Sequence, residues 1–318
     1  MFKGTARARL HEKLHYELWL LRFLPDLIEP NADGCDPTHL IFRNKKPGVI
    51  VNISGSVVIG AKRARRVVDA MLPFIFVTCC KTLDMVFEWI LEENYAACNI
   101  GPVPWRFGEK VKRVRRLQPD WFPPLMQSEP YLRDYLIALY GGLLDYRGEI
   151  AHGPGFDLSA DRLTIAPTKG GKPPLDLDRD QLTVLTKVAV AAARFLIGEV
   201  QFGPYQRQLL KHDLDRIQKC HNLPLFADPE PVLENVLLIV PAEAGVFRAD
   251  LAWLREQVAR RYRGKTVFFN LEVLGTVGEE PQCAWRFPYD EVPEHQVCEF
   301  RPGSHAGCAV SPTDIRPP

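Results

Sequence analysis

The most informative segment of the chain is Leu143-Leu144-Asp145-Tyr146-Arg147-Gly148-Glu149-Ile150-Ala151-His152-Gly153. From Leu132 onward, apolar residues recur at three- and four-residue spacing, which predicts a helix that ends at Gly153-Pro154. On a continuous α-helix, Arg147 and His152 would lie about 140° apart. We therefore expect the helix to unwind near His152 if these two side chains are to meet.

Similar periodicity predicts further helices on both sides of this segment. The predicted helices cover residues 8–28, 66–94, 128–151 and 180–200, with Ser128 as the cap of the third and Pro130 in its first turn. β-Branched residues around glycines predict a hairpin over residues 40–59, and residues 157–178 have a strand-like pattern. A short basic helix is expected over residues 108–117, inside a proline-rich connector.

The character of the chain changes after His212. An apolar run at 236–240, an amphipathic helix at 249–262 and a strand at 266–273 predict a compact β-α-β unit. The expected fold is mainly α, a four-helix bundle with a small α/β C-terminal domain. Its predicted parts are an N-terminal helix and hairpin (1–65), a helical domain (66–212), a β-α-β domain (225–274) and an irregular proline-rich tail (275–318).

Composition excludes several classes of protein. The 318 residues carry 40 Lys and Arg against 39 Asp and Glu, which excludes wholesale disorder and a globally basic nucleic-acid binder. Cys79 and Cys80 are adjacent within an apolar helical pattern, which argues against a disulfide framework and favours a reducing, cytoplasmic compartment. No uninterrupted apolar run reaches about 18 residues and the N-terminus lacks a signal-peptide core, so we expect no membrane association.

The pair of Arg147 and His152 suggests phosphate chemistry. Arginine provides a permanently charged fork for a phosphate, and histidine exchanges a proton near neutral pH. A nearby helix C-terminus favours the imidazolium, which suits a general acid or a phosphate clamp. A simpler explanation is that both residues only complement the helix dipole and that His-Gly-Pro ends the helix.

At Arg147-x4-His152, which follows a Leu/Tyr-rich helix and precedes Gly153, the chain resembles the HEPN (higher eukaryotes and prokaryotes nucleotide-binding) family over roughly residues 66–205. The resemblance implies a four-helix fold and a metal-independent endoribonuclease that works as a homodimer without a cofactor. Arg147 would bind the scissile phosphate and His152 would assist attack by the ribose 2′-hydroxyl, with Glu149 and Tyr146 orienting them. The resemblance also implies a toxin or defence effector.

Two positions depart from the family pattern. The family usually has a polar residue, often Asn, directly after the arginine, whereas this chain has Gly148. A tyrosine two residues after the histidine marks members controlled by nucleotidylation, and this chain has Pro154 there. The alternatives are therefore a non-catalytic HEPN-like module for nucleotide or RNA binding or for assembly, and a structural helical adaptor that holds a protein partner through its C-terminal domain.

Two short basic runs are candidate RNA contacts in this nearly neutral chain. They contain nine positive charges, at Lys62, Arg63, Arg65, Arg66, Lys110, Lys112, Arg113, Arg115 and Arg116. The second run is flanked by aromatic residues that could stack on unpaired bases. The alternative is a solvated basic helix face with the aromatic residues in the core.

Two further patterns call for a structural explanation. Cys283, His295, Cys298, His305 and Cys308 concentrate in the C-terminal segment, and the spacing of the last four makes them a candidate zinc site. Because this spacing matches no standard zinc finger, an irregular tail with incidental Cys and His is the alternative.

Gly141-Gly142 inside a predicted helix suggests close approach of another backbone, as at a dimer interface, or a simple kink.

Overall fold

The computed structural model describes residues 2–3, 7–28, 39–40, 50–51, 61–153, 155–159, 162–168, 171–278, 280–289, 291–302 and 309–310. At residues 8, 22–28, 39–40, 50–51, 61–68 and 309–310 it describes the backbone only. The chain forms two compact units. The helical unit contains residues 1–201 and 213–225, and the sheet unit contains residues 202–212 and 226–318.

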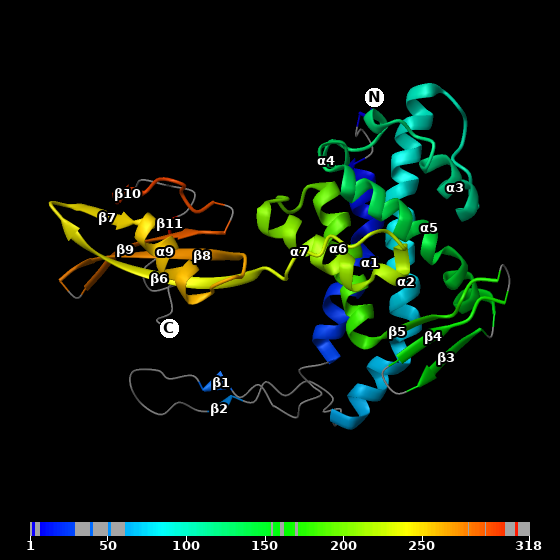
Figure 1. Ribbon diagram of the computed structural model, residues 1–318, viewed down its shortest axis with the longest axis horizontal. Coiled ribbons are helices and arrows are strands. Elements are labelled where there is room, and N and C mark those ends of the chain that lie inside the picture. Colours follow the sequence, from blue (N-terminus) through cyan, green and yellow to red (C-terminus); the bar gives the residue numbers. More distant parts are fainter. Residues whose placement is uncertain are drawn as a thin grey trace. The chain divides into compact units, whose positions relative to one another are not determined.

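Four long helices form the core of the helical unit (Figure 1): α1 (Arg7–Ile28), α2 (Ala61–Cys98), α5 (Pro130–His152) and α6 (Arg179–Ile197). Helix α2 packs against the other three, and α1 also packs against α6. One fully buried apolar side chain from each helix illustrates the shared core: Leu14, Phe87, Leu139 and Leu185. The predicted helical region is confirmed, and α1 belongs to it rather than to a separate N-terminal domain.

Shorter helices surround this core. Between α2 and α5 lie α3 (Phe107–Val114), a 3-10 turn (Pro119–Trp121) and α4 (Pro124–Ser128). Ser128 does not cap α5 as predicted, because its hydroxyl donates to the carbonyl of Leu125 within α4 and Glu129 precedes α5. After α6 come α7 (Pro204–Arg216) and α8 (Gln218–His221), so the predicted domain end at residue 212 falls inside a helix.

A small antiparallel sheet in the helical unit accounts for the strand-like segment. Its strands are β3 (Phe156–Ser159), β4 (Arg162–Ile165) and β5 (Leu175–Asp178), in that spatial order. Asp178 then starts α6 through a capping box with Gln181, whose backbone N–H donates to the Asp178 carboxylate at 2.7 Å. Of the predicted N-terminal hairpin, β1 (His39–Leu40) and β2 (Ile50–Val51) pair antiparallel, and its other residues lie outside the described part of the chain.

In its described residues, the sheet unit contains a half-barrel of six strands, one complete helix and the first part of α7. Its elements are β6 (Val232–Glu243), β7 (Val246–Asp250), α9 (Leu251–Arg261), β8 (Val267–Val277), β9 (Glu280–Phe287), β10 (Val297–Phe300) and β11 (Ala309–Val310). Strands β6 and β8 are parallel, with Val236 opposite Leu271, and the chain between them contains α9, as the β-α-β pattern predicted. The tail predicted to be irregular instead supplies β9 and β10, so the sheet continues well beyond residue 274.

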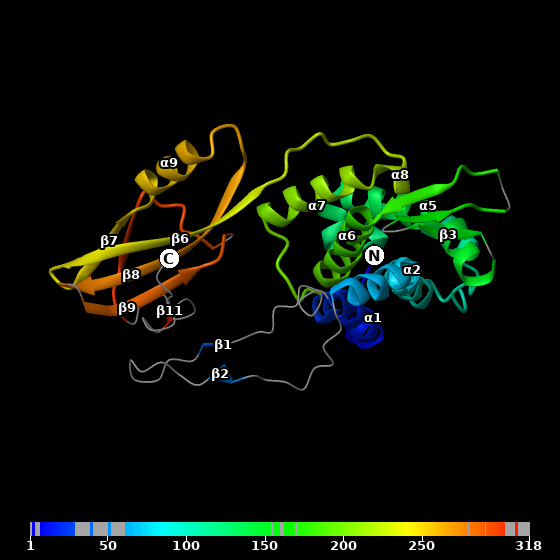
Figure 2. The ribbon, with the colours of Figure 1, turned by 90° about the horizontal axis from the view of Figure 1, so that it is seen from below.

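Helix α9 covers one face of this sheet (Figure 2). Leu254 of α9 belongs to the same buried cluster as Leu271, Trp285 and Phe300 from the strands. Strand β10 alternates exposed and buried residues, and β8 alternates half-buried and buried residues over most of its length, as one covered face requires. The sheet unit therefore has its own hydrophobic core.

The glycine pair of α5 fits a close helix contact within one chain. A Cβ at Gly142 would lie 2.1 Å from the carbonyl oxygen of Cys220 in α8, and one at Gly141 would lie 2.6 Å from Nη2 of Arg115. Gly142 is therefore explained by the backbone of α8 without a second copy of the chain. A Cβ at Gly148, later in the same helix, would meet no atom within 4 Å.

Gly142 and Gly148 provide a matched pair of substitutions in the same helix. We expect Gly142→Ala to destabilise the protein by about 1–3 kcal/mol, because the added methyl group forces α8 away from α5. Gly148→Ala should stabilise it by about 0.5–1 kcal/mol, because the methyl group is unobstructed and alanine favours the helix. Urea unfolding would measure both, and a Gly142→Ala protein as stable as the wild type would contradict the close approach.

Candidate functional site

Arg147 points from α5 toward α3 rather than into solvent. Its guanidinium carbon lies 3.9 Å from the ring centroid of Phe107, and the side chain is half-buried. Its Nε is buried and has no hydrogen-bond partner among the described residues. Arg147, Phe107, Cys80 and Tyr140 line a small cavity enclosed by α2, α3 and α5. Cation-π stacking and packing between helices therefore occupy much of this side chain.

His152 is the exposed last residue of α5. The helix does not unwind before it, since the N–H of Gly153 still donates to the carbonyl of Glu149 at 2.9 Å. The backbone becomes extended only at Gly153. Arg147 and His152 thus remain about 140° apart around α5, and one chain does not bring them together.

Glu149 and Tyr146 form hydrogen bonds to the chain after β4, and their expected role in orienting the Arg147-x4-His152 motif stays a prediction. The Glu149 carboxylate accepts hydrogen bonds from the backbone N–H and the hydroxyl of Thr168, at 2.9 and 2.8 Å. The Tyr146 hydroxyl donates to the carbonyl of Pro173 at 3.0 Å. These two side chains thereby link Thr168 and Pro173, respectively, to α5.

Lys110, one of the predicted RNA contacts, is buried in a cluster of charged and polar groups. Its ammonium lies 3.0 Å from Oδ2 of Asp84 and also donates to Glu88, while the Tyr140 hydroxyl donates to Asp84. With only 4% of its surface exposed, Lys110 is not available to RNA. We call these four residues, Asp84, Glu88, Lys110 and Tyr140, the charge cluster.

The pKa values in the charge cluster reflect both burial and the contacts among its members. Burial raises the pKa of Asp84, although hydrogen bonds from Tyr140 and Lys110 counteract that effect. Burial alone would raise the pKa of Glu88, but the hydrogen bond from Lys110 and the charges of Lys110 and Lys13 bring this pKa below its ordinary value. Burial alone would lower the pKa of Lys110, but its two carboxylate partners raise it. The cluster therefore links α2, α3 and α5 through charge-assisted hydrogen bonds.

Sequence reasoning missed this cluster, although a signal was present. Asp84, Glu88 and Glu92 follow one another at four-residue intervals in an otherwise apolar part of α2, so they share one face of the helix. Acidic residues repeated on the face of a core helix indicate buried or half-buried ion pairs. Lys13 of α1 completes the row, 3.2 Å from Glu92.

The other cations of the second basic run are exposed. They are Lys112, Arg113, Arg115 and Arg116, which we call the α3 basic surface. None of the four forms an ion pair with a residue in the described part of the chain. The Arg115 guanidinium lies over Gly141 of α5. Just before α3 in the chain, Trp105 is 78% exposed, and the guanidinium carbon of Arg106 lies 5.0 Å from its ring centroid.

The first basic run begins α2. Lys62, Arg63, Arg65 and Arg66 all lie in its first two turns, and their side chains are outside the described part of the structure. Their predicted role as RNA contacts stays a prediction.

The predicted zinc ligands are not assembled in the residues that the structure describes. Cys298 is buried in the hydrophobic core of the sheet unit, whereas His295 is exposed. Burial raises the pKa of both Cys283 and Cys298, which disfavours the thiolate that zinc requires. His305 and Cys308 lie outside the described residues, within which no group of three or more His, Cys, Asp or Glu side chains could hold a metal.

Among the described residues, one helical segment, Asp69–Cys98, is long and apolar enough to cross a membrane. Of the most apolar 18-residue window in this segment, 61% is buried inside the protein. The central helix of a helical core has the same properties, so this segment is weak evidence for a membrane span.

Lys110 and Lys112 allow the charge cluster to be tested against the α3 basic surface. We expect Lys110→Met to destabilise the protein by roughly 3–5 kcal/mol, because it leaves buried carboxylate charge without its cation. Lys112→Met, the same substitution on the exposed side of α3, should change stability by less than about 0.5 kcal/mol. Equal unfolding midpoints in urea for the two variants would contradict the burial of Lys110.

No family model, no curated protein and no solved structure matches this chain.

Proposed function

We propose that this protein binds single-stranded RNA through the α3 basic surface and Trp105, on a helical unit of the HEPN type. The HEPN assignment is supported by the four packed helices and by the position of Arg147-x4-His152 at the end of α5. Binding is the function that the geometry supports best. The observation that carries it is the set of exposed cations on the α3 basic surface, which form no ion pair within the described part of the chain and follow the exposed Trp105 in sequence.

The α3 basic surface has the properties of a phosphate-binding surface. Its four cations form no ion pair with a carboxylate in the described part of the chain. Each can therefore neutralise a phosphate and release a counterion. Trp105 adds a flat face on which an unpaired base can stack. Duplex RNA offers no unstacked base for such a residue, so single-stranded RNA is the better ligand.

Three observations favour binding over cleavage. Arg147 is half-buried against Phe107, His152 lies on another side of α5, and Gly148 replaces the polar residue that the resemblance implies. A metal-independent endoribonuclease is the second candidate, because His152 is exposed at the helix end and remains accessible to a partner or substrate. In that case a homodimer would have to supply the arginine and histidine from different chains.

RNA binding can be tested by charge removal. We expect Lys112→Gln/Arg113→Gln/Arg116→Gln to weaken binding of a labelled 20-nucleotide single-stranded RNA about tenfold or more. The slope of log K against log salt should become shallower by roughly 2, because single strands contribute about 0.7 per phosphate contact. Fluorescence anisotropy at several salt concentrations measures both quantities.

The control removes the same number of charges elsewhere. Arg260→Gln/Arg261→Gln/Arg263→Gln neutralises exposed arginines at the end of α9 in the sheet unit. If both triple variants lose RNA affinity equally, or neither does, the α3 basic surface is not the binding site.

The same RNA distinguishes binding from cleavage. With EDTA present, we expect no new 2′,3′-cyclic phosphate ends after incubation with the wild-type protein, because one chain does not bring Arg147 and His152 together. Cleavage that is abolished both by Arg147→Ala and by His152→Ala would replace this proposal with the endoribonuclease. Denaturing gels and chemical analysis of the 3′ ends provide the measurement.

A further inference from the structure

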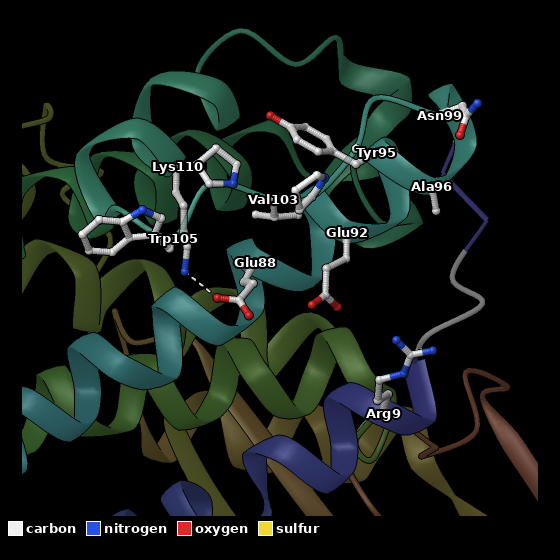
Figure 3. Close-up of a pocket in the computed structure, with 12 residues that line it drawn as sticks. Arg9, Glu88, Glu92, Tyr95, Ala96, Asn99, Val103, Trp105 and Lys110 are labelled. Carbon is white, nitrogen blue, oxygen red and sulfur yellow. Dashed lines mark hydrogen bonds and ion pairs between the residues drawn. The ribbon is translucent and has the colours of Figure 1, made fainter.

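An open pocket of about 620 Å³ lies beside Trp105 in the helical unit (Figure 3). It is formed by α1, α2, the first turn of α3 and the loop between α2 and α3. The side chains that matter for the argument are Arg9, Glu88, Glu92, Tyr95, Trp105 and Lys110. The volume is in the range of sites that hold small ligands and cofactors.

The pocket combines aromatic walls with a carboxylate that can accept hydrogen bonds. Trp105 is 78% exposed, and Tyr95 also lines the pocket. In Figure 3 the carboxylates of Glu88 and Glu92 lie between Trp105 on one side and Arg9 on the other. A ligand that fits this arrangement has a flat face for the indole and N–H donors for a carboxylate.

The two carboxylates differ in their availability. Glu88 is engaged by Lys110 within the charge cluster. Glu92 has a single ion pair, from its Oε1 to Lys13 at 3.2 Å, and its Oε2 has no partner among the described residues. Because Lys13 and Glu92 are both about one third exposed, this pair is weak and leaves Glu92 able to bind a ligand.

The charged side chains that line the pocket balance one another, so a ligand with both donor and anionic groups fits better than a purely cationic or purely anionic one. Two carboxylates, Glu88 and Glu92, are balanced by two cations, Lys110 and Arg9. Arg9 is exposed at one side of the pocket, where it can meet an anionic group. A nucleotide has these three parts in one molecule: a flat base, N–H donors on its edge and a phosphate.

We propose that this pocket binds one guanine nucleotide unit of the single-stranded RNA. The base stacks on Trp105, its adjacent N1–H and N2–H groups donate to Glu92, and its phosphate lies near Arg9. Guanine is the base whose two neighbouring donors match the two oxygens of a carboxylate. The inference rests on the proposed function and adds to it a base preference, because the α3 basic surface alone reads only phosphates.

Mononucleotides test the pocket separately from the α3 basic surface. Isothermal titration of the full chain should show binding of GMP, weaker binding of IMP, which lacks only the 2-amino group, and no measurable binding of ribose 5-phosphate. Trp105→Ala should weaken GMP binding roughly 5- to 150-fold, since one stacking contact is lost. Glu92→Gln should abolish the preference for GMP over IMP.

The control for the tryptophan is Trp253→Ala, which truncates another exposed tryptophan, 52% exposed, on α9 of the sheet unit. It should bind GMP as the wild type does, and circular dichroism verifies that all three variants fold. Equal binding of GMP and ribose 5-phosphate, or equal binding by the Trp105 and Trp253 variants, would overturn the proposal. Tighter binding of methylguanidinium than of GMP would also overturn it and identify a cation pocket.

The measurement of GMP binding is separate from the measurement of RNA binding by the α3 basic surface, so either can fail alone. If charge removal on α3 weakens RNA binding but GMP does not bind, the proposed function stands and the base pocket fails. If GMP binds at Trp105 but charge removal on α3 has no effect on RNA, the base pocket stands and the α3 surface fails.

Discussion

The ion pair between Lys110 and Asp84 determines how α3 lies on the helical core. Because Lys110 is buried against α2 together with Val111 and Val114, the helical period of α3 directs its remaining cations outward. The Tyr140 hydroxyl on Asp84 extends the same cluster to α5. A buried ion pair adds little net stability compared with apolar packing, but removing one partner is costly, so arrangements that separate Lys110 from Asp84 are disfavoured.

That arrangement also determines the environment of the Arg147-x4-His152 motif. With α3 held on α2 and α5, Phe107 stacks on the Arg147 guanidinium and covers its Nε. Releasing Arg147 to a phosphate would require α3 to move or the side chain to give up this stacking. The motif therefore contributes to packing in this chain, while the exposed cations lie elsewhere on α3. A short motif fixes residue types and spacing, but the neighbouring helix determines whether the arginine is available.

Helices were predictable from sequence, whereas the partners of polar residues were not. Apolar periodicity placed α1, α2, α5 and α6, because one buried face is a local property of each helix. The burial of Lys110 depends on its contact with Asp84, which lies 26 positions away in the sequence. The basic run around Lys110 gave no indication of this contact. The partners of Glu149 and Tyr146 were not predictable for the same reason, since these partners lie near them only in the folded chain. The strands β9 and β10 were missed because proline and glycine obscured their short alternating patterns.

The net charge of +1 conceals a separation of charge that the fold produces. Acidic residues of α2 face α1 and α3, where Lys13 and Lys110 neutralise them. The cations of the α3 basic surface are exposed to solvent. At physiological ionic strength, charges more than about 8 Å apart are largely screened, so an RNA strand responds to the nearest surface rather than to the total. A balanced chain can therefore present a locally basic surface, as it does here through the exposed cations Lys112, Arg113, Arg115 and Arg116.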